Sequence, residues 1–170
     1  MPRSSLALFL FAAAAQAVPE GFVIREFLGN AQEPEIYPTA VSAAANGDLY
    51  VSSDKNGSLG HTPGMGRILL ARDTKGAGVA DQVIEYTKVE SPRGGHFVGG
   101  VLYLVHPPFL SKFQDKNGDG KADYNTERTL LVDGLGGGIE HPRGADHTTN
   151  GTRMGIDGWL YIAVGDFGAG

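Results

Sequence analysis

Asn46-Gly-Asp-Leu-Tyr50-Val-Ser52 is the stretch that decides the fold, because a Gly-containing turn is followed at once by a Leu-Tyr-aliphatic run of strand length. The same arrangement returns at Gly99-Gly-Val-Leu-Tyr103-Leu-Val105 and at Asp157-Gly-Trp-Leu-Tyr161-Ile-Ala163. Beyond Ala17, helical periodicity is almost absent, whereas short apolar runs bounded by Gly, Asp or Asn recur. The chain is therefore predicted to be all-β, with many short strands joined by tight turns.

Two further pairs of similar segments, which we call echoes, indicate the length of the repeating unit. The loop Asp73–Asp81 matches the loop Asp115–Asp123 at its first Asp, two Gly, Ala and last Asp, an offset of 115 − 73 = 42 residues. Pro92-Arg93-Gly-Gly-His96 resembles Pro142-Arg143-Gly-Ala-Asp-His147 at an offset of 142 − 92 = 50. Periods of about 40 to 50 residues with several short strands are typical of propeller blades, each a four-stranded sheet. The repetition of the arginine indicates a structural task, since an active site needs a residue once.

The predicted architecture is a partial six-bladed β-propeller of about two and a half blades. A propeller has to close into a ring to avoid open sheet edges, so we expect residues 18–170 to be the N-terminal blades of a longer protein. A small β-sandwich and a ring assembled from several copies are the alternatives. The expected strands lie near residues 40–44, 49–53, 67–72 and 82–87, then 94–98, 101–105, 109–114 and 126–132, then 151–154 and 159–164.

Composition narrows the functional classes. The 170 residues carry a formal charge of −5 and no run of Lys or Arg, so nucleic acid is not an expected partner. The sequence has no Cys, which excludes disulfides, thiolate zinc sites and a covalently attached c-type haem within this stretch. Redox chemistry would need a cofactor that is bound without a covalent link.

The first 17 residues have the pattern of a secretory signal peptide. One basic residue, Arg3, precedes an apolar run, and the small-x-small end Ala15-Gln16-Ala17 follows. We expect cleavage after Ala17 and a secreted or periplasmic mature protein. An uncleaved anchor is the alternative, although the apolar run is short for the roughly 20 residues that a spanning helix needs.

His147 and Asp166 are the predicted catalytic residues. A polar turn and a hydrophobic strand separate this base from this carboxylate. An imidazole titrates near neutral pH, and a carboxylate beside it can fix its tautomer, which is how a general base is built. A turn histidine and a turn-forming aspartate are the structural alternatives.

His61, His106 and His141 have no partner at metal spacing and are predicted to be surface or loop residues.

The second echo loop is a candidate calcium site. It supplies oxygens at its first, third, fifth and ninth positions with Gly120 at the sixth, as a calcium loop does. Its twelfth position is Thr126, with Glu127 one step late, and the loop at 73–81 keeps the glycine without the ligands. A structural calcium or a tight turn without metal therefore both remain open. The expected ligands are Asp115, Asn117, Asp119 and Asp123.

Together, the leader, the Leu-Tyr blades, the Asp-x-Asn-x-Asp-Gly loop, Asp146-His147 and Gly165-Asp166 resemble one family. The chain is similar, over residues 21–170, to the six-bladed propeller of the quinoprotein glucose/sorbosone dehydrogenases, especially the membrane-bound dehydrogenase branch of planctomycete-type bacteria. The resemblance implies oxidation of a sugar or alcohol hydroxyl, with His147 as general base, Asp166 orienting it and Asp146 lining the cofactor site. It also implies pyrroloquinoline quinone (PQQ) as cofactor and a c-type haem domain downstream as electron acceptor.

The implied cofactor site would be incomplete in this stretch. In that family, the calcium ligands and the cations that hold the carboxylates of the quinone lie in later blades. The fragment alone is therefore not expected to be active. A non-catalytic binding propeller and a calcium-stabilised scaffold module of a cell-surface protein are the competing functions.

Overall fold

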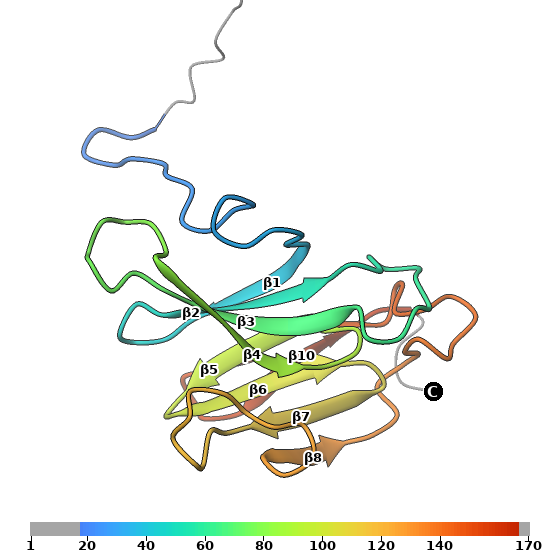
Figure 1. Ribbon diagram of the computed structural model, residues 1–170. Coiled ribbons are helices and arrows are strands. Elements are labelled where there is room, and N and C mark those ends of the chain that lie inside the picture. The colour runs from blue at the N-terminus through green and yellow to red at the C-terminus, as the bar shows by residue number, and fades with distance from the viewer. Residues whose placement is uncertain (1–17, 167–170) are drawn as a thin grey trace, which may run out of the picture.

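The computed structural model describes residues 18–166 (Figure 1), and the expected leader at 1–17 lies outside this part of the chain. All regular structure in the described part is β-structure, arranged in three antiparallel sheets, none of which closes on itself. The first sheet has the order β1-β2-β3-β4, the second β5-β6-β7-β8, and the third is the hairpin β9-β10. The strands are β1 (Pro38–Ala43), β2 (Leu49–Asp54), β3 (Gly66–Arg72), β4 (Gln82–Lys88), β5 (Gly94–Val98), β6 (Val101–His106), β7 (Phe109–Phe113), β8 (Arg128–Val132), β9 (Thr149–Met154) and β10 (Leu160–Val164).

The predicted strands are confirmed, with each end within two residues of its expected position. The first strands of the sheets start at residues 38, 94 and 149, so the repeat is 94 − 38 = 56 and 149 − 94 = 55 residues long. The predicted period of about 40 to 50 residues was therefore too short. The loop echo did identify matching positions, because the two loops join β3 to β4 and β7 to β8.

The first strands of the three sheets lie next to one another, β1 against β5 and β5 against β9. Side chains join β1 to the second sheet, since Thr39 Oγ1 donates to the carbonyl of Pro92 at 2.6 Å and Ser42 Oγ accepts from Phe97 N at 2.8 Å. Glycines allow the closest approach: a Cβ on Gly94 in β5 would lie 2.4 Å from the Cα of Gly151 in β9. Each sheet thus meets the next at its first strand.

The main core lies between the first two sheets, which Figure 1 shows one above the other. Tyr50 of β2 stacks on Phe97 at a centroid distance of 4.1 Å and meets the edge of Tyr86 at 5.0 Å. Leu102 and Phe113 complete the centre of this core from the second sheet, with exposures of 1% and 0%. Such contacts between large apolar side chains are the main source of stability in a fold of short strands.

The three Leu-Tyr runs place their side chains in the same sense. Tyr50 faces the second sheet, Leu102 faces back to the first, and Leu160 packs against the cluster of Val105 on the second. Because side chains alternate along a strand, Tyr103 and Tyr161 point away from the sheet that precedes theirs, on the side that corresponds to the one on which Tyr50 meets the second sheet. The Leu-Tyr repeat in the sequence therefore corresponds to a repeated orientation of side chains relative to the neighbouring sheets.

Among residues 18–166, no helix is long and apolar enough to cross a membrane.

Candidate functional site

His147 and Asp166 are brought together by the β9-β10 hairpin. His147 lies just before β9 and Asp166 just after β10, and Nδ1 of the histidine is 2.9 Å from Oδ1 of the aspartate. A carboxylate accepts, so Nδ1 of His147 carries a proton, and in the neutral form of the ring the lone pair is then on Nε2. This is the tautomer that a general base facing away from its aspartate requires. The contact expected from the sequence is present, while its catalytic role stays a prediction.

Two backbone features position this pair. His147 adopts a left-handed φ of 50°, which is uncommon for a residue with a side chain and often marks a functional site. Gly165 donates its N–H to the Thr148 carbonyl at 2.7 Å, and a Cβ at this glycine would lie 2.3 Å from the carbonyl oxygen of His147. Only glycine lets the end of β10 come this close, and Asp166 reaches the imidazole as a result.

Asp146 extends the site on the other side of the imidazole. Its Oδ2 accepts from the Arg143 guanidinium at 3.1 Å, and its Oδ1 lies 3.8 Å from Nε2 of His147. His147 and Asp146 line a cavity of about 440 Å³, with Thr39, Ser58, Arg93 and Asn150 among the other lining residues. This opening collects hydroxyl, amide and charged groups from β1, from β9 and from loops that flank the strands.

Arg93 and Arg143 do not have matching places, which corrects the equivalence expected from the Pro-Arg-Gly echo. Arg93 directly precedes β5, whereas Arg143 lies six residues ahead of β9 (149 − 143 = 6). The Arg93 side chain is buried and forms an ion pair of 2.9 Å with the buried Asp54 of β2. Its task is structural, as the sequence indicated, but Arg143 is half exposed and pairs with Asp146 instead.

The candidate calcium loop closes through its own backbone. The Asp115 carboxylate accepts from the N–H groups of Gly118 at 2.6 Å and Gly120 at 2.8 Å, and in the sister loop Asp73 accepts in the same way from Ala77 and Gly78. The hydrogen bonds from the N–H groups of Ala77 and Gly78 are the main reason why the pKa of Asp73 is lower than usual.

Glu127 anchors the same loop from inside. This residue is 6% exposed, and its two oxygens accept from the N–H groups of Lys116, Asn117 and Asp123 at 2.8–3.2 Å. Within residues 18–166, no three His, Cys, Asp or Glu side chains converge on a point that could hold a metal ion. A calcium site at Asp115, Asn117, Asp119 and Asp123 stays a prediction from the sequence.

His106 differs from its expected place, because the sequence predicted a surface or loop residue. It ends β6 and is 1% exposed. Burial, assisted by the nearby Arg128 cation, lowers the pKa of His106 to about 3, so the ring is neutral at pH 7. The sequence does contain the signal, since His106 ends an apolar strand and is followed by Pro107-Pro108.

The described residues therefore define an all-β protein of successive antiparallel sheets, with a paired histidine and aspartate at the end of its third sheet. The chain belongs to the family described as Domain of unknown function (DUF7133), whose model matches residues 12–170. No curated protein matches the chain. No solved structure matches it either.

Proposed function

We propose that the chain forms the first blades of a β-propeller and carries the proton-accepting site of an extracytoplasmic dehydrogenase. The carrying observation is the 2.9 Å contact between His147 Nδ1 and Asp166 Oδ1, next to an open polar cavity. Two observations support a propeller. The first two sheets are complete four-stranded meanders, and the first strands of successive sheets are in contact, β1 with β5 and β5 with β9. The location rests on the leader-like sequence of residues 1–17.

The proposed reaction oxidises a hydroxyl of a sugar or an alcohol. Nε2 of His147 accepts the proton of the hydroxyl, while the hydrogen on the same carbon departs as hydride to a separate two-electron acceptor. Asp166 holds the imidazole and stabilises the imidazolium that forms. Asp146, 3.8 Å from Nε2 on the other side, lines the cavity in which the hydroxyl would lie.

PQQ, the acceptor that the resemblance implies, is not accommodated by the described residues alone. Arg93 is the cation lining the cavity, and its charge is already matched by the buried Asp54. Arg143 pairs with Asp146. The carboxylates of the quinone would need further cations, so the chemistry proposed for this chain is limited to holding and moving the hydroxyl proton.

The test is a dye-reduction assay on the full-length protein with added PQQ, CaCl₂ and a panel of sugars and primary alcohols. We expect His147→Gln to lower any oxidation rate by about 10²–10⁴-fold, the usual contribution of a general base, and Asp166→Asn to lower it less. His61→Gln is the matched control, because His61 is exposed and its Nδ1 lies 2.7 Å from the Ile139 carbonyl, away from His147. Oxidation that survives in His147→Gln would remove the assignment.

A non-catalytic propeller that binds a glycan is the second candidate. The observation favouring it is the cavity lining itself, because Thr39, Ser58 and Asn150 offer the hydroxyl and amide groups that sugars pair with. In that case the parent chain would show saturable sugar binding by calorimetry and no oxidation. His147→Ala would then change affinity alone.

A further inference from the structure

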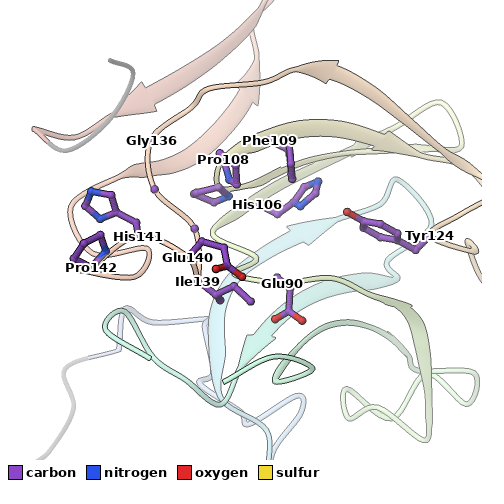
Figure 2. A pocket seen from close by; sticks show the side chains of 13 residues that line it. Glu90, His106, Pro108, Phe109, Tyr124, Gly136, Ile139, Glu140, His141 and Pro142 are labelled. Carbon is purple, nitrogen blue, oxygen red and sulfur yellow. The ribbon is translucent and has the colours of Figure 1, made fainter. Parts of the chain in front are cut away.

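A second cavity lies away from His147, between the β6-β7 turn and the segment 136–142 (Figure 2). Its volume is about 460 Å³, which is in the range of small-molecule sites. Pro108, Phe109, Tyr124 and Ile139 give it a mostly apolar wall, and His106 lines it from the end of β6. His147 and Asp166 are not among its lining residues.

The proton of His106 is assigned by its neighbours. Its Nε2 lies 2.9 Å from Ser111 Oγ, and the same oxygen accepts from Arg128 Nε at 2.8 Å. Ser111 is fully buried, so its own O–H is satisfied only by donating to Nε2 of His106. The proton of the neutral ring is therefore on Nδ1.

The Nδ1–H of His106 is available to donate a hydrogen bond to a ligand. Within residues 18–166 this nitrogen has no hydrogen-bond partner, and it is not among the unpartnered polar atoms that are sealed from solvent. It therefore reaches open volume, and the volume that the ring borders is this cavity. An apolar pocket with a directed donor selects a ligand that brings an acceptor.

The charge of the lining disfavours an anion. Glu90 and Glu140 both belong to the wall, which contains no Lys or Arg among the described residues. Oε1 of Glu90 accepts from Gly64 N at 2.6 Å, while its Oε2 is buried without a hydrogen-bond partner. Arg128 does not line the cavity; its guanidinium lies over the rings of Phe109 and Tyr124, 5.1 and 4.5 Å from their centroids.

We propose that this cavity binds a neutral aromatic molecule with a carbonyl oxygen, which accepts the Nδ1–H of His106. The apolar wall takes the ring, the histidine orients the carbonyl, and the two carboxylates exclude the corresponding acids. Ser111 is a positioning residue, since it fixes the tautomer and does not line the cavity.

The test compares acetophenone with isopropylbenzene, which has nearly the same shape and no acceptor. Binding is measured by NMR titration of the whole chain and of His106→Phe. We expect the variant to lower the ratio of ketone to hydrocarbon affinity by about three- to tenfold, the effect of one neutral hydrogen bond. His96→Phe makes the same change outside the cavity and should leave the ratio unchanged. An unchanged ratio in His106→Phe, tighter binding of benzoate, or no binding of either probe would each overturn the proposal.

A second measurement needs no change at His106 itself. The ¹⁵N shifts of its ring in the parent chain should report a protonated Nδ1, and the Nδ1–H resonance should move on addition of acetophenone and not of isopropylbenzene. Ser111→Ala should introduce the other tautomer. A parent chain with the proton on Nε2 would contradict the assignment even if every variant failed to fold.

Discussion

At the scale of single residues, His106 should make the stability of the chain depend on pH. Its pKa falls from 6.5 to about 3 on folding, so between these values the unfolded chain binds the proton and the folded chain does not. The contribution of this residue is therefore complete above pH 6.5 and is lost as the pH falls toward 3. Between pH 7.5 and 5.5 the loss should be about 1.4 kcal/mol.

Urea unfolding at the two pH values checks this prediction. His106→Phe keeps a ring of similar shape and removes the titration, so the difference in unfolding free energy between pH 7.5 and 5.5 should shrink by about 1.4 kcal/mol. His61→Phe, which makes the same substitution at an exposed histidine, is measured beside it as the control. An equal pH dependence in the parent and in His106→Phe would show that His106 is solvated in the folded chain.

The ion pair of Arg93 and Asp54 is a second feature of this scale. Their side chains are 6% and 0% exposed, so removing one partner leaves a buried charge without its counterpart. Arg93→Ala should cost about 3–5 kcal/mol in urea unfolding, and Asp54→Asn a similar amount. The exposed pair of Lys55 and Glu35 is the matched control, and Lys55→Ala should change the unfolding free energy far less. If the two ion pairs give equal costs, the Arg93 site is open to water.

At the scale of elements, the sequence predicted what depends on neighbours along the chain. The Leu-Tyr runs follow turns such as Asn46-Gly47, where Gly47 takes a φ of 92°, and period-two alternation then determines which side chain faces the core. The pairing of His147 with Asp166 also follows from one hairpin. By contrast, the burial of His106 and the Arg93-Asp54 pair depend on contacts between different sheets or loops. The apolar strand that ends at His106 indicates burial of that residue, but a single sequence does not show which partners meet in such contacts, and the Pro-Arg-Gly echo misled for this reason.

The loop between β7 and β8 gives the prediction that belongs to an element. Because Glu127 binds three backbone N–H groups where a calcium loop would bind its ion, Glu127→Gln should cost about 1.5–3 kcal/mol of unfolding free energy. Glu85→Gln, which removes a partly exposed contact of 3.8 Å with Lys88, should cost almost nothing. EDTA should leave the melting temperature of the parent unchanged. A rise in that temperature on adding CaCl₂ would instead support the calcium ligands predicted from the sequence.

At the scale of the whole molecule, the third sheet exposes a face that the first two sheets cover. Tyr50 and Tyr161 hold matching places after matching turns, yet Tyr50 is 8% exposed and Tyr161 is 58% exposed. Trp159, two residues before Tyr161, is 72% exposed. Since the equivalent face of each earlier sheet packs on its successor, this face has the chemistry of an interface.

We therefore expect residues 18–166, prepared on their own so that this face is uncovered, to associate through the Tyr161 face in solution. Sedimentation equilibrium should show a concentration-dependent mass, and the double change Trp159→Lys with Tyr161→Lys should return the chain to the monomer, because two charges would have to be buried in the contact. Val23→Lys is the control, since Val23 is 74% exposed and lies in the segment before β1. Association that persists in the double variant and disappears in the control would place the contact on the N-terminal segment. Because a propeller sheet packs its face on the next one around a ring, association through the third sheet is the behaviour that distinguishes this architecture from a closed sandwich.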